Sequence, residues 1–103
     1  MKQTIYYKVL NNNYRSVGLL GARKIRYFKT VKTYPYEEIS NHPRKGGGLW
    51  VVKRLSDARQ IIKYLKRKHN IVGKIFECDI GSILYETPYR VKTCWVKLDK
   101  EVA

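Results

Sequence analysis

One segment of the chain has the spacing of a helix that is apolar along one side, and this requires the rest of the chain to supply a surface for it. Its apolar residues fall at i, i+3, i+4 and i+7: Ala58, Ile61, Ile62 and Leu65. Ser56 is the predicted N-cap, and Asp57 places a negative charge at the positive end of the helix dipole. A basic run at 66–69 followed by Asn70 suits the C-terminal end.

The segments around this helix have strand patterns: most alternate with a period of two, and 49–53 is a continuous apolar run typical of a buried strand. We predict strands at 4–10, 24–32, 49–53, 74–80 and 90–98, with Gly81 bending the fourth into 83–85. In the second strand, Ile25, Tyr27 and Val31 are expected to share one face. A short helical turn near 15–20 or 36–40 is an open alternative. The predicted fold is α+β, in the order β-β-β-α-β-β: a small, mostly antiparallel sheet of about five strands with one helix packed on one face.

Length and composition fit a single basic domain spanning residues 1–103. The chain is 44% hydrophobic, which is enough for a core and too apolar for a disordered basic tail. No apolar run approaches the roughly 20 residues of a membrane helix, and the N-terminus has no secretion signal. A cytoplasmic protein is therefore the simplest expectation.

The two cysteines, Cys78 and Cys94, lie too far apart for a Cys-x-x-Cys motif. Two reduced thiols are favoured, and a disulfide between neighbouring strands is the alternative. No His/Cys cluster surrounds them, so neither a metal nor another cofactor is expected.

The net charge of +14, from 22 Lys and Arg against 8 Asp and Glu, is the compositional fact that bears on function. A surplus of this size gives a positive potential over most of the surface and favours anionic partners. Three segments are candidates for carrying the contact.

The first candidate is the polar side of the predicted helix, from which Arg59, Lys63, Lys66 and Arg67 project. Lys53 and Arg54 lie just before its N-cap. A solvated helix face usually mixes signs for i,i+4 pairing, and here Asp57 is the only acid between Leu49 and His69. We favour nucleic-acid binding over an ordinary solvated face.

The second candidate is the basic and aromatic second strand. Its cations, Arg23, Lys24, Arg26, Lys29 and Lys32, interleave with Tyr27, Phe28 and Tyr34. Cations that track phosphates beside rings that stack on bases are typical of single-strand binding grooves. The RNA-recognition signature is absent, and rings that belong to the core are the alternative.

The third candidate is the loop Pro-Arg-Lys-Gly-Gly-Gly at 43–48, where Arg44 and Lys45 precede three glycines. Backbone N–H groups of such a loop can form an anion-binding nest. The loop precedes a strand and lacks the Lys-Ser/Thr pair of a phosphate-loop NTPase. A mobile loop is the alternative.

No catalytic constellation is evident. Glu77 and Asp79 point to the same side of one predicted strand and are therefore neighbours. We favour two carboxylates on the solvent-exposed face of a strand over a pair for acid–base catalysis. Spacing cannot show whether either cysteine lies near His42 or His69.

Five segments carry a resemblance to known proteins: YKVLN at 7–11, GLWVV at 48–52, LSDA at 55–58, IFEC at 75–78 and VKTCWVKL at 91–98. Together they resemble a group of small, uncharacterised accessory domains of bacteriophages and archaeal viruses. The resemblance implies a viral accessory protein acting in the host cytoplasm, without an established activity.

The strand, Gly-Leu-Trp segment and following helix also look like a minimal ADP-ribosyltransferase half-fold. That likeness nominates Glu77 as the acid, with Tyr6 or Tyr7 as its partner. The Glu-x-Glu and Gln-x-Glu pairs of that family do not occur here.

We therefore expect a non-enzymatic protein that binds nucleic acid or a nucleoprotein complex through the three basic segments. An inhibitor of host defence, of the anti-CRISPR kind, would fit this size and charge. The alternatives are a diverged ADP-ribosyltransferase and a basic module that docks an acidic host protein.

Overall fold

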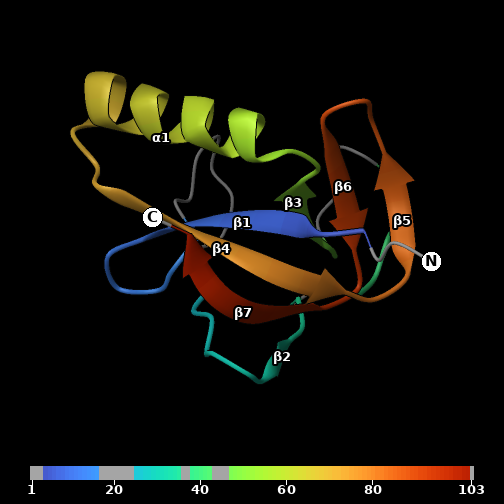
Figure 1. Cartoon of the computed structure of the whole chain (residues 1–103). Coiled ribbons are helices and arrows are strands. Elements are labelled where there is room, and N and C mark those ends of the chain that lie inside the picture. The colour runs from blue at the N-terminus through green and yellow to red at the C-terminus, as the bar shows by residue number, and fades with distance from the viewer. Residues whose placement is uncertain (1–3, 17–24, 36–37, 43–46, 103) are drawn as a thin grey trace.

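The computed structural model describes residues 4–16, 25–35, 38–42 and 47–102. Within them the chain forms seven strands and one helix (Figure 1). In chain order they are β1 (Tyr6–Asn11), β2 (Lys32–Thr33), β3 (Leu49–Val52), α1 (Leu55–His69), β4 (Gly73–Ile80), β5 (Ile83–Glu86), β6 (Arg90–Thr93) and β7 (Val96–Val102). The α+β prediction with one helix on a sheet is confirmed, and the strand count is seven rather than about five.

The strands form one sheet in the order β2-β7-β4-β1-β3-β6-β5, and every pair of named strands is antiparallel. Helix α1 lies across β1, β3 and β4 on one side of this sheet (Figure 1). Strands β5 and β6 extend beyond the helix and leave that side of the sheet open next to the start of α1.

Two apolar clusters fill the two sides of the sheet, because successive residues of a strand point to opposite faces. Val9 and Ile75 point toward α1 and pack with Ala58 and Leu65, so the apolar stripe of α1 covers one face of the sheet as predicted. Their neighbours Leu10 and Phe76 belong to the second cluster, on the other face. A sheet buried on both sides explains why β1 and β4 are apolar at consecutive positions.

A single long hairpin organises the second half of the chain. Strands β4 and β5 pair with β7 and β6, around the turn at 87–89. The hairpin bends where Gly81 faces Trp95: Gly81 N–H donates to the Trp95 carbonyl at 3.0 Å, and Cys94 N–H donates to the Ser82 carbonyl at 3.2 Å. Beyond the bend β6 pairs with β3, while before it β4 pairs with β1, so the sheet curls around the second cluster.

This bend corrects the prediction of one strand at 90–98. The chain forms β6 and β7 instead, interrupted at Cys94 and Trp95. The bend at Gly81 is confirmed, and a Cβ at Gly81 would lie 2.5 Å from the Trp95 ring. Since that space is already filled, glycine permits the close approach that the bend requires.

The prediction of a strand over 24–32 is largely wrong. Residues 25–31 cover the second cluster as an irregular segment, held by isolated bridges of Arg26 to Arg15 and of Lys29 to Leu98. Ile25 and Tyr27 are buried as expected, but Val31 is 56% exposed. Thr30 has a positive φ of 62°, which ends the alternation before Val31. The helical turns considered near 15–20 and 36–40 lie partly outside the described residues, and 38–40 is not helical.

Candidate nucleic-acid interface

Helix α1 begins two residues earlier than its capping pattern predicts. Its N-cap is Arg54, in extended conformation and without a side-chain cap, so the prediction of Ser56 as N-cap is wrong. Asp57 lies in the first turn as predicted, and Arg54 Nε donates to Asp57 Oδ2 at 3.2 Å. The C-terminal end is as predicted: Asn70 has a left-handed backbone and its N–H donates to the Lys66 carbonyl.

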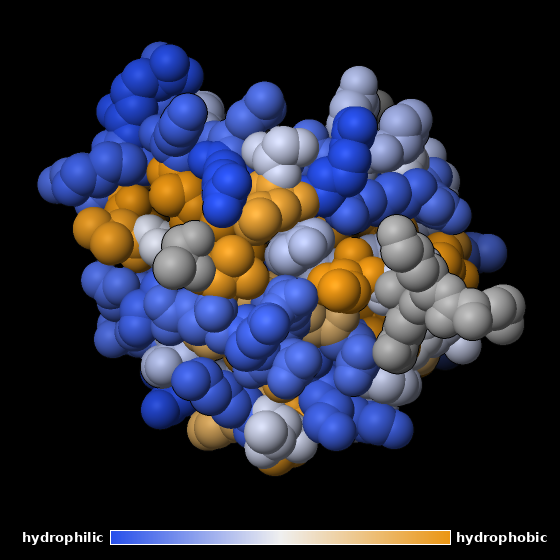
Figure 2. Space-filling model, in the orientation of Figure 1, coloured by the Kyte–Doolittle hydropathy of each residue, from blue (hydrophilic) through white to orange (hydrophobic). Residues whose placement is uncertain are grey.

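The outer face of α1 carries cations that no described carboxylate neutralises. Its exposed cations are Arg59, Lys63, Lys66, Arg67 and Lys68. Within the described part of the chain, the ion pairs of this region are Arg54 with Asp57 and Lys53 with Glu86, and none involves these five. Figure 2 shows hydrophilic side chains over the surface where α1 lies, above a band of hydrophobic ones. Apart from Lys53 and Arg54, which pair with Glu86 and Asp57, the first candidate segment is thus an exposed positive face without ion pairs to described carboxylates.

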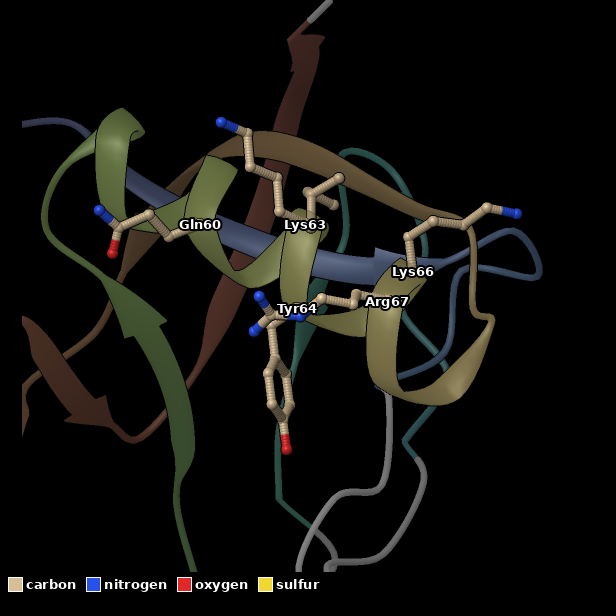
Figure 3. Close-up of a pocket in the computed structure, with 6 residues that line it drawn as sticks. Gln60, Lys63, Tyr64, Lys66 and Arg67 are labelled. Atoms are coloured by element: carbon tan, nitrogen blue, oxygen red, sulfur yellow. The ribbon is translucent and has the colours of Figure 1, made fainter.

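A shallow hollow of about 780 Å³ lies among these side chains. It is lined by Gln60, Ile62, Lys63, Tyr64, Lys66 and Arg67. In Figure 3 the ammonium groups of Lys63 and Lys66 point outward in different directions, while the Tyr64 ring projects away from the helix. Tyr64 is 42% exposed, so the helix presents an aromatic surface among its cations.

A second hollow of about 790 Å³ separates the first half of α1 from the β5–β6 turn. It is lined by Val52, Arg54, Ser56, Asp57, Gln60, Ile61, Tyr64, Tyr89 and Arg90, and we call it the hairpin groove. Gln60 and Tyr64 line both hollows. The basic helix face therefore continues, through these two residues, to Tyr89 and Arg90 on the hairpin.

Aromatic rings hold the cations of the hairpin groove. Val52 is the register partner of Arg90, which places Arg90 diagonally from Trp50 on the same side of the sheet. The Arg90 guanidinium carbon lies 4.1 Å from the centroid of the Trp50 ring, and Tyr85 contacts that ring edge-on at 6.3 Å. The Arg54 guanidinium lies 5.7 Å from the Tyr89 centroid. Cation–π contacts of this kind orient a cation without neutralising it.

The second candidate segment lies on the other side of the sheet. Arg26 and Lys29 border a small hollow of about 250 Å³ with Tyr14, Tyr27 and Phe28. Phe28 is exposed, with the Arg26 guanidinium 5.2 Å from its centroid, and Lys32 Nζ lies 4.4 Å from the Trp95 centroid. Tyr27 belongs to the cluster opposite α1, so the structure does not unite this segment with the basic helix face.

Four predicted site residues, Arg23, Lys24, Arg44 and Lys45, lie outside the described residues. Two glycines of the third candidate segment are described. Gly47 has a φ of +86° and a Cβ there would meet the Glu38 carbonyl oxygen at 1.8 Å. A Cβ at Gly48 would meet the Lys92 side chain at 2.4 Å. Packing therefore accounts for both glycines without an anion.

Two lysines are buried, which the alternation of their strands did not predict. Lys8 Nζ donates to the Trp50 carbonyl at 2.7 Å and lies 5.1 Å from the Tyr27 centroid. Burial lowers the pKa of Lys8 from 10.5 to about 8. Lys92 is 1% exposed, and its Nζ donates to the His42 carbonyl at 2.8 Å.

The groups considered for catalysis do not converge among the described residues. The Glu77 carboxylate pairs with Lys100 at 3.4 Å, Asp79 is exposed, and none of the three hollows above includes either. Cys78 and Cys94 are both free thiols, and burial raises the pKa of Cys78 to about 12. The described residues contain no group of His, Cys, Asp or Glu that could hold a metal ion, and no described helix is long and apolar enough to cross a membrane.

Comparison with known proteins gives no relative for this chain: no family model, no curated protein and no solved structure matches it.

Several residues of this surface escaped the sequence analysis. Gln60, Tyr64, Tyr89 and Arg90 line the hollows, and Trp50 supports Arg90. The pair Tyr89-Arg90 follows a predicted turn, but no spacing rule connects that turn with the start of α1. The exposure of Tyr64 could have been predicted from the sequence, because Tyr64 lies in the predicted helix but is not one of the residues of its apolar stripe.

Proposed function

We propose that the protein binds nucleic acid, without catalysing a reaction, through the outer face of α1 and the adjoining hairpin groove. The observation that carries the proposal is a continuous surface on which Lys63, Lys66, Arg67 and Arg90 meet no described carboxylate. Like charges gathered on one surface repel one another, and bound phosphates would reduce that repulsion.

Counterion release would supply most of the affinity. Each Lys or Arg that replaces a condensed counterion on a phosphate makes binding more sensitive to salt. The cations of α1 lie on a rigid helix, so their spacing is fixed before the nucleic acid arrives. The sequence resemblance would place this activity in a viral accessory protein whose target is a nucleoprotein complex of the host.

Fluorescence anisotropy with a labelled oligonucleotide tests the proposal. We expect log K to fall linearly with log salt over roughly 50 to 200 mM. The double variant Lys63→Gln/Arg67→Gln should weaken binding and lower the magnitude of the slope by about 0.7 to 0.9 for each phosphate that the variant no longer neutralises.

The matched control is Arg26→Gln/Lys29→Gln, which removes the same charge from the opposite side of the sheet. Equal losses from both double variants would show that net charge, and not the α1 face, determines binding. No binding at low salt would refute the proposal, and capture of an acidic protein that survives nuclease treatment would favour protein docking instead.

A further inference from the structure

The hairpin groove differs from the rest of the basic surface because aromatic rings stand on two of its sides. Tyr64 projects from α1 and Tyr89 from the β5–β6 turn, and both line the groove. They are 42% and 59% exposed, so neither ring is used to fill the core. Large exposed rings on a small domain are a feature that charge alone does not explain.

The walls between these rings carry groups that can hydrogen-bond a planar polar ligand. The Gln60 amide both donates and accepts, and the Ser56 hydroxyl does the same. The Asp57 carboxylate accepts only and is already engaged by Arg54. Val52 and Ile61 add apolar surface to the lining. Flat apolar faces with hydrogen-bonding edges are the chemistry of a nucleobase.

Two guanidinium groups border the same groove. Arg54 lies against the Tyr89 ring and Arg90 lies against the Trp50 ring, so both are oriented before a ligand binds. A base that enters between the tyrosines would bring its own phosphate close to Arg90, which forms no ion pair with a described carboxylate, whereas Arg54 is paired with Asp57. Stacking platforms beside oriented cations are the parts of a single-strand binding groove.

A double helix cannot use these rings in the same way, because each base in a duplex is already stacked on its neighbours and paired along its edge. The groove volume of about 790 Å³ is within the range of sites that take drug-sized ligands, and the groove is open to solvent. An unpaired strand could therefore lay a base in it and continue along α1.

We propose that the hairpin groove binds an unpaired base of single-stranded nucleic acid between Tyr64 and Tyr89, which makes single strands the preferred ligand of the surface. This inference rests on the proposed function and adds the class of nucleic acid that is bound. DNA and RNA share the required chemistry, so both are arms of the test.

The test compares three labelled ligands of equal length: an oligodeoxythymidine, an oligouridine and a DNA duplex. We expect at least one single strand to bind more tightly than the duplex. Tyr64→Leu and Tyr89→Leu should each weaken single-strand binding about fivefold or more, because loss of one base–aromatic stack has that effect. The salt slope should stay unchanged, since no cation is removed.

Tyr34→Leu is the matched control, since Tyr34 is exposed and does not line the groove. Tyr64→Phe and Tyr89→Phe keep the ring and should retain binding, which separates stacking from a role of the hydroxyl. Circular dichroism spectra identical to wild type establish that the leucine variants are folded.

Two results would overturn the inference, and only one of them would also overturn the proposed function. Equal binding of duplex and single strands, unaffected by both leucine substitutions, would refute base stacking and leave the charge-based proposal standing. Absence of binding to all three ligands at low salt would refute the proposed function and this inference with it.

Discussion

The guanidinium of Arg90 lies 4.1 Å above the centroid of the Trp50 ring, although the two residues are far apart in the sequence. The pairing of β3 with β6 creates this contact, and it places the cation at the edge of the hairpin groove. Trp95, the other tryptophan, lies beside Lys32 at a distance of 4.4 Å to its centroid. Each tryptophan therefore reports on a different basic segment.

Tryptophan fluorescence should show which segment the ligand contacts. In the Trp95→Phe variant, emission comes from Trp50 alone. A bound single strand should quench or shift this emission, because a phosphate that binds Arg90 moves or neutralises the guanidinium that lies against the Trp50 ring. In the Trp50→Phe variant, emission from Trp95 should change little. A titration in which Trp95 responds and Trp50 does not would locate binding near β2 instead.

The buried Lys8 should make stability increase with pH between pH 8 and pH 9. Its pKa is about 8 in the folded protein against 10.5 in the unfolded chain, so in this interval the unfolded state holds more protons and folding is favoured as pH rises. Below pH 8 the cost of burying the charge is present in full. The pKa of Cys78 is raised from 9.0 to about 12, which opposes the trend by about 0.4 kcal/mol between pH 8 and pH 9 and by more above pH 9; this contribution is common to wild type and Lys8→Met.

Urea unfolding of wild type and Lys8→Met at both pH values measures this contribution. We expect the wild-type free energy of unfolding to increase by about 1 kcal/mol more than that of Lys8→Met from pH 8 to pH 9. Methionine keeps a similar volume and does not titrate. The same pH dependence in both proteins would show that Lys8 titrates normally.

Substitutions of Ser56 and Asp57, in the first turn of α1, should affect the free energy of unfolding differently. Ser56 caps no N–H, so Ser56→Ala should change the free energy of unfolding by less than about 0.5 kcal/mol, where loss of an N-cap costs about 1 kcal/mol. Asp57→Asn should cost about 0.5 to 1 kcal/mol, through its contact with Arg54 and its place at the helix dipole. Thermal or urea unfolding distinguishes them, and a larger loss at Ser56 would contradict the observed cap.

The two thiols should react at very different rates. Cys78 is 3% exposed and its pKa of about 12 leaves almost no thiolate at neutral pH, whereas Cys94 is half-buried. An aromatic disulfide reagent should modify one thiol in the native protein and the second only after unfolding. Cys94→Ser should abolish the native reaction, and a fast reaction in that variant would show that Cys78 is accessible.

The elements that sequence patterns predicted well are those whose own apolar residues follow a regular local pattern, although the strands they pair with lie far along the chain. The apolar stripe of α1, the alternation in β1 and β4 and the continuous apolar run of β3 are local patterns, and all four elements were found within two residues of their predicted ends. Two strand predictions failed because the chain bends at single positions, and tertiary packing sets where these bends fall. Thr30 breaks a predicted strand through a positive φ, and Cys94 and Trp95 break another because the sheet curls there.

Part of the candidate interface could also be predicted from the sequence, and part required the tertiary structure. The helix cations could be named from the sequence, because charge and helical period suffice to place them on one exposed face. That this face continues to Tyr89 and Arg90 depends on the pairing of β3 with β6, which brings together residues far apart in the chain.

The sequence by itself determined an α+β domain with one amphipathic helix and a large positive charge, since periodicity and composition are properties of short segments. Only the tertiary structure decided that the basic second segment and the basic helix lie on opposite sides of the sheet, and that a groove with two tyrosines adjoins the helix. Both depend on strand order and on the bend at Gly81. Long-range pairing sets these features, and no local pattern encodes it.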